Sequence, residues 1–153
     1  MQITIAAEPL DSADARRLIA ALDAHLAERY PPEEVIGLTL RPEHVEPGRG
    51  TFVIARGDGV AIGCGALHKL DETTSELKRM FVDPAVRGRG VGKEILDHLE
   101  RAGQSWGARR VVLATGSYQT EAIGLYRRAG FKEIECLDEY ARSPSSLCFE
   151  KEI

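Results

Sequence analysis

Residues 82–92 read Val-Asp-Pro-Ala-Val-Arg-Gly-Arg-Gly-Val-Gly, a proline followed by a turn rich in glycine and arginine. Pro84 ends the extended segment before it, because proline has no N–H for a strand ladder. The three glycines admit a backbone turn that exposes successive N–H groups to an anion. A helix that begins near Gly90 points its positive end at the same place. With its two arginines, the segment predicts a pocket for a phosphate or pyrophosphate.

The flanks of this turn predict a strand before it and a helix after it. Residues 75–83 (SELKRMFVD) alternate polar and apolar side chains up to Arg79, where three apolar residues follow. A β-bulge or a fully buried strand end would explain that break. After the turn, apolar residues recur on one helical stripe: Val91, Ile95, Leu99, Ala102 and Trp106. We expect Trp106 to anchor this helix on a sheet.

Short strands and two more helical stretches account for most of the remaining chain. Strands are predicted at residues 3–5, 51–56, 60–70, 109–115, 131–135 and 145–153. Helices are predicted from residue 12 to just before Tyr30, as one helix or a broken pair, and at 120–130. Gly57-Asp58-Gly59 predicts a hairpin turn, and Gly130 ends the last helix. The order β-α(α)-βββ-α-β-α-ββ predicts an α+β fold.

Length, composition and charge exclude several classes of protein. The 153 residues, 43% of them hydrophobic and 29% charged, suit one packed domain over residues 1–153. A net charge of -4 argues against non-specific nucleic-acid binding, which needs a basic surface. There is no apolar run of ~18 residues and no signal-peptide pattern, so we expect no membrane association and a cytoplasmic location.

The cysteines and histidines predict neither a disulfide framework nor a metal site. The cysteines are odd in number, widely spaced and without a CxxC pair, so we expect all to be reduced and buried: Cys64, Cys136 and Cys148. The histidines do not pair with other ligands at metal-binding spacing: His25, His44, His68 and His98. His68 and His98 are expected at the surface.

The glycine-rich turn belongs to no common nucleotide motif by itself. It is not a G-x-x-x-x-G-K-[ST] loop, and it lacks a full G-x-G-x-x-G in a parallel βαβ unit. Its context is more specific. Residues 76–100 (ELKRMFVDPAVRGRGVGKEILDHLE) and 111–134 (VVLATGSYQTEAIGLYRRAGFKEI) closely resemble the GNAT family of acetyl-CoA-dependent N-acetyltransferases. The R-x-x-G-x-G pattern and the later L-Y-x-x-x-G-F pattern fall on Arg87, Gly90 and Gly92 and on Leu125, Tyr126, Gly130 and Phe131.

The resemblance covers nearly the whole chain and implies a fold and a cofactor site. It implies a mixed, mostly antiparallel sheet of six to seven strands with helices on both faces. The strands at 75–83 and 109–115 would splay apart and hold acetyl-CoA between them. Gln119 stands where many relatives have an asparagine that contacts the cofactor. The cofactor-binding residues implied in this way are Met80, Phe81, Val82, Arg87, Gly88, Arg89, Gly90, Val91, Gly92, Lys93 and Gln119.

The implied reaction, attack of an amine on a thioester, predicts two catalytic residues. An amine with a pKa of ~10.4 is neutral in about one molecule in two thousand at pH 7, so it must lose a proton. Tyr126, at the family's usual position for the acid, would protonate the departing thiolate, and Glu76 would act as base through a water. A backbone N–H near Phe81 would stabilise the oxyanion. The alternatives are that Tyr126 only packs on the sheet and that Glu76 pairs with a surface lysine.

The acceptor is expected to be a small-molecule amine or the terminal amino group of a peptide. Tyr30, Glu33 and Glu34 lie in the loop that shapes the acceptor site in relatives, and Tyr140 is a further candidate. A solvated acidic loop is the alternative. A non-catalytic acyl-CoA sensor or scaffold is the second hypothesis for the whole protein, and another phosphorylated ligand at the turn is a third. Homodimer formation is left open.

Overall fold

A computed structural model describes residues 1–35 and 38–153. Its centre is a seven-stranded sheet in the order β1-β2-β3-β4-β5-β7-β6. The strands are β1 (Ile3–Ala7), β2 (Gly50–Gly57), β3 (Val60–Lys69), β4 (Thr74–Val82), β5 (Arg110–Gly116), β6 (Lys132–Ile134) and β7 (Ser146–Glu152). The helices are α1 (Ala13–Arg29), α2 (Val91–Ser105) and α3 (Thr120–Arg128), with short 3-10 turns η1 (Pro32–Glu34), η2 (Pro42–Val45), η3 (Pro84–Val86) and η4 (Asp138–Arg142). The predicted α+β class and mostly antiparallel sheet are confirmed.

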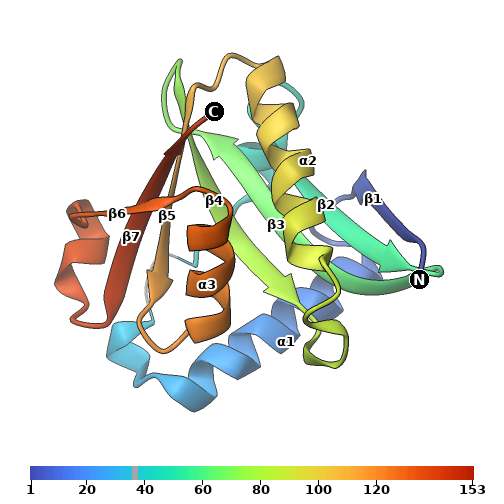
Figure 1. The fold of residues 1–153 in the computed structure, drawn as a ribbon, viewed down its shortest axis with the longest axis horizontal. Coiled ribbons are helices and arrows are strands. Elements are labelled where there is room, and N and C mark those ends of the chain that lie inside the picture. The colour runs from blue at the N-terminus through green and yellow to red at the C-terminus, as the bar shows by residue number, and fades with distance from the viewer. Residues whose placement is uncertain (36–37) are drawn as a thin grey trace.

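Helices cover both faces of the sheet (Figure 1). On one face α1 buries Leu18 against a cluster that includes Phe52 and Phe81. On the other face α2 and α3 pack on a larger cluster, in which Ile95 and Leu99 are almost completely buried. Each such side chain contributes roughly 1.5–3 kcal/mol relative to an exposed one. The Trp106 Nε1 donates to Ser75 Oγ at 3.0 Å, so Trp106 anchors the end of α2 to β4 as expected.

Local chemistry accounts for the element boundaries. Ser12 caps α1 by accepting a hydrogen bond from Ala15 N at 3.1 Å, and α1 is one unbroken helix. The β2–β3 turn places Asp58 at φ 50° and Gly59 at φ 85°, the left-handed pair that two-residue hairpins favour. No helix in the described ranges is long and apolar enough to cross a membrane.

A bulge interrupts β4 where the alternation of the sequence breaks. Cys64 is paired with Phe81 and Ala66 with Lys78, so one residue of β3 lies opposite two of β4. Arg79 adopts φ 58°, and its carbonyl accepts a hydrogen bond from Cys64 Sγ at 3.3 Å. Of the two explanations for the break, the bulge is confirmed. It places consecutive residues of β4 in orientations that regular alternation would not allow.

Strands β4 and β5 run parallel but stay together for only a short distance. Residues 74–76 pair with residues 110–112, and no pairing between these strands follows. Figure 1 shows the two strands diverging from this common start, with α3 lying in front of the gap. Beyond this start, β4 continues along β3 and β5 along β7, so the sheet divides between β4 and β5.

Two expectations about cysteine and histidine were wrong. Cys136 and Cys148 form a disulfide, with their Cα atoms 5.3 Å apart, while Cys64 is free and buried as expected. The pairing of β6 with β7 places Ile134 opposite Cys148 and so brings Cys136, two residues later, beside it. His68 is buried rather than at the surface, with 8% of it exposed, since Glu76 of β4 hydrogen-bonds its Nε2 and the ring of His44 stacks on it.

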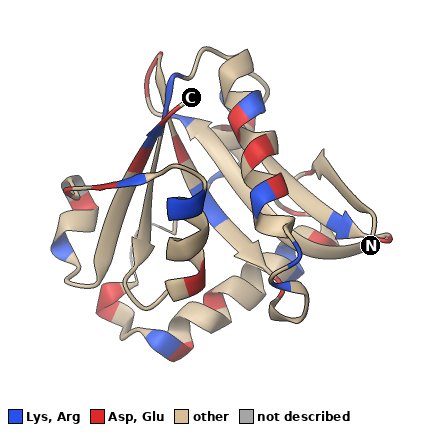
Figure 2. Ribbon diagram, in the orientation of Figure 1, with Lys and Arg blue, Asp and Glu red and all other residues tan. Residues whose placement is uncertain are grey.

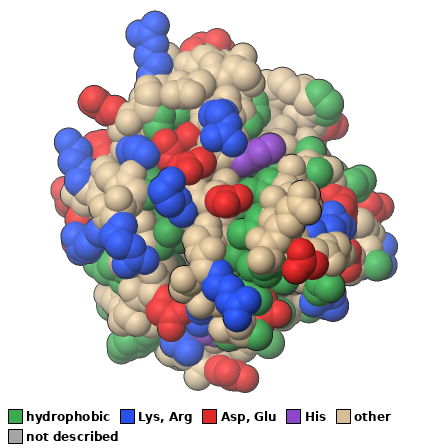
Figure 3. All heavy atoms as spheres, turned by 45° about the vertical axis from the view of Figure 1, so that its right-hand side comes forward, with side chains coloured by type: hydrophobic (Ala, Val, Ile, Leu, Met, Phe, Trp, Pro, Cys, Tyr) green, Lys and Arg blue, Asp and Glu red, His purple; other side chains and the backbone are tan. Residues whose placement is uncertain are grey.

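Charges of both signs are mixed over the surface. Along α2, basic residues near both ends flank acidic ones (Figure 2). The face shown in Figure 3 likewise intersperses the two signs without one large basic area. This distribution accords with the slightly negative net charge of -4.

Candidate active site

A cavity of about 120 Å³ lies where β4 and β5 diverge. Its walls come from five parts of the fold. They are α1 with the loop after it (Leu22, Leu26, Tyr30, Glu34, Val35, Leu38), β4 (residues 77–80), β5 (residues 113–116), α3 (Gln119, Ala122, Tyr126) and the C-terminal segment (Tyr140, Ser145, Ser146). The sequence-predicted residues Met80, Tyr126 and Gln119 therefore meet at one place. Glu76 is not part of the lining.

The edge of β4 that faces this gap offers unpaired backbone groups. Beyond residue 76 it has no strand partner on the β5 side. Met80 packs toward the core under α2, while Phe81 is buried in the core under α1 with 8% of it exposed. The side chains are thus anchored in the two cores, and the N–H and C=O groups between them are available to an extended ligand with amide groups, such as pantetheine.

The turn after β4 has a backbone geometry that suits the predicted binding of an anion. Gly88 and Gly90 adopt φ 83° and 82°, a region that L side chains rarely occupy. Gly90 is the N-cap of α2 and provides no side-chain cap. The first amides of α2 therefore lack both an intrahelical acceptor and a capping group, and they suit a pyrophosphate.

The other residues of the turn have separate tasks. A Cβ at Gly92 would lie 2.7 Å from a methyl of Leu125, so this glycine lets α3 pack closely against α2. Arg87 forms a 2.9 Å ion pair with Glu121 of α3, and Lys93 pairs with Asp97 at 2.8 Å. Arg89 is exposed. The positive charges surround the turn, and the pair from Arg87 links it to α3.

Tyr126 lines the cavity from a buried position on α3. Its ring lies against Phe131 and Phe149, with centroids 5.8 and 6.4 Å away. Only 5% of the residue is exposed, and burial raises the pKa of its hydroxyl well above the ordinary value. No hydrogen bond within the described chain uses this hydroxyl. The group is protonated at neutral pH and has a proton to donate.

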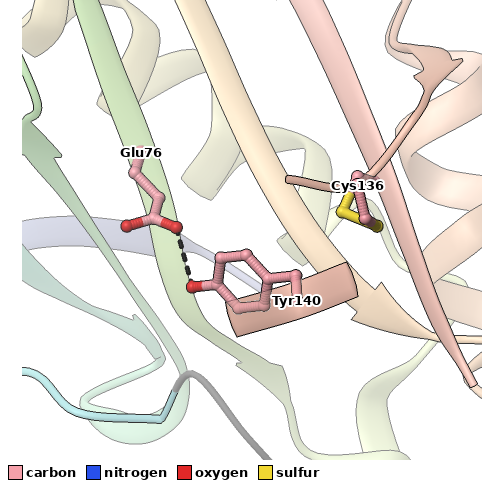
Figure 4. Close-up of a disulfide and its surroundings, with 4 residues drawn as sticks. Glu76, Cys136 and Tyr140 are labelled. Atoms are coloured by element: carbon pink, nitrogen blue, oxygen red, sulfur yellow. Dashed lines mark hydrogen bonds between the residues drawn. A yellow bond between two sulfur atoms is a disulfide. The ribbon is translucent and has the colours of Figure 1, made fainter. Parts of the chain in front are cut away.

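Glu76 lies outside the cavity lining and accepts hydrogen bonds from two side chains. His68 Nε2 donates to one carboxylate oxygen at 3.0 Å, and the hydroxyl of Tyr140 donates to the other at 2.8 Å. Burial raises the pKa of Glu76, but the hydrogen bond from His68, the charge of Lys78 and the hydrogen bond from Tyr140 together bring it below its ordinary value. Figure 4 shows Glu76 on β4 and Tyr140 on η4 pointing toward each other, beside the disulfide at Cys136.

The loop after α1 and the start of α3 close the remaining walls. Tyr30 accepts a hydrogen bond from Tyr118 N at 3.0 Å, and its ring occupies the space that a Cβ at Gly116 would need. His25 Nε2 donates to Gln119 Oε1 at 3.0 Å, so the side chain of Gln119 links α3 to α1. Glu34 lines the cavity, whereas Glu33 is exposed and does not.

One buried charge in this region was not predicted as a site residue. Arg79 has 8% of its surface exposed and lines the cavity. In the sequence it served only to mark where the alternation of β4 fails. Arg79 stands beside an apolar run, at the point where a bulge was expected. That position was the signal in the sequence that its charged side chain could point into the protein. Among the described residues, no group of three or more histidine, cysteine or acidic side chains could hold a metal ion.

Comparison with known proteins finds relatives of similar sequence over nearly the whole chain. An IAA acetyltransferase of Azospirillum brasilense is 37% identical over 97% of both chains. The uncharacterized N-acetyltransferase YsnE of Bacillus subtilis is 31% identical over 94% of this chain and 97% of its own.

Among solved structures, an acyl-CoA N-acyltransferase from Klebsiella pneumoniae superposes with a TM-score of 0.84 at 31% identity, covering 99% of this chain and 97% of the other. The PaiA N-acetyltransferase of Thermoplasma acidophilum, solved with coenzyme A, shares the fold with a TM-score of 0.74 at 21% identity, and each chain covers 100% of the other. The model of the acetyltransferase (GNAT) family matches residues 15–131, and on this match and these full-length likenesses the chain belongs to the GNAT family of acetyltransferases.

Proposed function

We propose that this acetyltransferase transfers the acetyl group of acetyl-CoA to a primary amine by direct attack on the thioester. The observation that carries the proposal is the divergence of β4 and β5. The cavity there is lined by β4, whose edge is unpaired beyond residue 76, and by Tyr126 of α3. The uncapped N-terminus of α2 lies at the end of the same strand edge. A thioester-bearing pantetheine with a pyrophosphate needs these three features together.

The binding roles follow from the exposed backbone. The edge of β4 at Met80, Phe81 and Val82 would hydrogen-bond the pantetheine arm, while the amides of the turn and of the first turn of α2 would hold the pyrophosphate. Arg87 and Lys93 would add charge after leaving the carboxylates that they now contact. Gln119 would act by fixing α3 against α1 through His25.

The proposed reaction needs an oxyanion donor and an acid. The amine nitrogen forms a bond to the thioester carbonyl carbon, and the oxyanion that develops accepts a hydrogen bond from a β4 amide near Phe81. The C–S bond then breaks and Tyr126 gives its proton to the sulfur. Solvent returns a proton to Tyr126. A phenol whose pKa is raised by burial suits this role, because it is protonated at neutral pH.

Removal of the amine proton is assigned to the Glu76–Tyr140 pair. Tyr140 lines the cavity and Glu76 stands behind it, so the carboxylate would act through this hydroxyl or a water beside it. A carboxylate with a lowered pKa is a weak base. The expected consequence is a rate that rises about tenfold per pH unit below the pKa of the acceptor, as the neutral amine becomes more abundant.

The test combines binding with turnover. Acetyl-CoA and desulfo-CoA are titrated calorimetrically into the protein, and thiol release is then followed with a panel of small amines and short peptides with free N-termini. We expect both ligands to bind and at least one amine to accelerate thiol release. Binding without release by any amine would favour the acyl-CoA sensor. No binding of either ligand would refute the proposal.

A further inference from the structure

Arg79 is a buried, charged side chain whose guanidinium has fewer hydrogen-bond partners than it could use. Its Nη2 donates to Asp23 of α1 at 2.6 Å. Its Nη1 is buried and has no hydrogen-bond partner in residues 1–35 and 38–153. The side chain of Asp23 is half exposed, whereas that of Arg79 is 5% exposed. The guanidinium is thus more deeply buried than the carboxylate that neutralises it, and part of its donor capacity is unused.

Buried donors of this kind are costly. A buried charged group that lacks a partner loses its hydration without a compensating hydrogen bond, and most buried polar groups in proteins are paired for that reason. The backbone at Arg79 also has φ 58°, which is unfavourable for a residue with a Cβ. Such features persist where the surrounding structure enforces them, and they are enriched at ligand sites.

Arg79 lies in the wall of the cavity. Arg79 lines the active-site cavity and also a second hollow between α1 and residues 38–40, with Tyr30, Val35 and Leu38 shared by both walls. The charged side chains that line the first cavity, within the described chain, are Glu34, Lys78 and Arg79. Most of the wall contributed by α1 and its loop is apolar. Tyr126 and Arg79 therefore both border the space that an acceptor would occupy.

We propose that Arg79 binds a carboxylate of the acceptor, which makes the acceptor class a small amino acid rather than a simple amine. This inference rests on the proposed function and specifies its substrate. A guanidinium presents donors in a planar fork that matches the two oxygens of a carboxylate. Asp23 occupies Nη2 and leaves Nη1 for the substrate. Glu34 is the carboxylate in the lining that would face a cationic amine.

The test compares acceptors that differ only at the carboxylate. Glycine, alanine, leucine, methionine, phenylalanine and glutamate are each assayed beside their carboxamide and the corresponding decarboxylated amine. For the best acceptors we expect kcat/KM to be about 10- to 100-fold higher for the acid than for its amide, the ratio that a hydrogen bond between charged groups supports. Equal rates for acid and amide in every set would overturn the inference.

Variants then assign the preference to Arg79. Arg79→Met should reduce kcat/KM for the acid much more than kcat/KM for its amide, so that the ratio of the two falls toward one. Arg101→Met, at an exposed arginine of α2, should change neither. Arg79→Lys keeps the charge without the fork and should give an intermediate preference, which covers the case in which Arg79→Met does not fold. Equal losses for acid and amide in Arg79→Lys would overturn the assignment.

A binding measurement separates this inference from the proposed function. The same amino acids are titrated into the protein saturated with desulfo-CoA, without any turnover. Binding of an amino acid that its amide does not match, and that Arg79→Lys weakens, supports the carboxylate site even if no amine releases thiol. Failure of all amines to release thiol would count against the proposed function alone. Amino acids that bind no better than their amides would overturn the carboxylate site alone.

Discussion

Reduction of the Cys136–Cys148 disulfide is expected to lower the free energy of unfolding by about 3 kcal/mol. The bond joins residues 12 positions apart. In the chain-entropy model, removing a cross-link that closes a loop of this size returns about 10 cal/mol/K of entropy to the unfolded chain, which is about 3 kcal/mol at 25 °C. For a chain of this length that difference lowers Tm by roughly 6–12 °C.

The assay is urea unfolding and thermal melting with and without a phosphine reductant. Cys136→Ala, which cannot form the bond, is the control and should melt at one temperature in both conditions. Titration of thiols in the denatured, unreduced protein should find Cys64 alone. A fall of less than about 1 kcal/mol, or reaction of all three cysteines before reduction, would refute the reasoning.

The same bond has a functional consequence. It closes the segment that carries Tyr140 and Ser145, both of which line the cavity. The proposed pyrophosphate site lies between β4 and α2, away from the residues that the disulfide joins. Reduction should therefore raise KM for the acceptor and leave the Kd of acetyl-CoA unchanged. Equal changes in both constants would contradict this separation of the two subsites.

Three other changes test individual parts of the site. Tyr126→Phe should lower kcat by about a hundredfold or more, the usual contribution of a general acid, whereas the exposed Tyr118→Phe should not. Gly90→Val, at φ 82°, should raise the Kd of acetyl-CoA about tenfold or more while pantetheine alone binds as before, checked by calorimetry. Glu76 has a lowered pKa in the folded protein, so its charge contributes stability above pH about 4.5, and this contribution is lost as the pH falls through the lower, folded-state pKa. Glu76→Gln should therefore reduce the difference in unfolding free energy between pH about 7 and about 3.

Much of the fold could be predicted because its determinants are local. The hairpin at Gly57–Gly59, the cap at Ser12 and the proline–glycine turn after β4 each specify a backbone conformation within a few residues. The break in alternation at Arg79 likewise indicated a bulge that the structure contains. The element order and the backbone turn at the start of α2 were therefore predictable from local sequence.

The missed features depend on which distant segments become neighbours. Cys136 reaches Cys148 only because β6 folds back along β7 at the edge of the sheet. Tyr140 meets Glu76 across 64 positions of sequence, and Arg79 meets Asp23 across 56. No periodicity within one element contains these contacts. They follow from the packing of whole elements, so the hydrogen-bond partners of Glu76 and Arg79 cannot be read from their own strand.

The direction of β4 and β5 explains why the site forms where it does. Of the strand pairs in the described chain, only this one is parallel, and parallel neighbours need a crossover, which α2 supplies. Both strands therefore end on the same side, so the turn that begins α2 and the turn that begins α3 lie beside one gap. The first turn provides amides for an anion and the second leads to Tyr126. Because pairing stops after residue 76, the strand edge between these turns stays open. Extending the pairing by further residues would fill the gap with backbone hydrogen bonds and remove the cavity, so the short register is a condition of acetyl transfer in this fold.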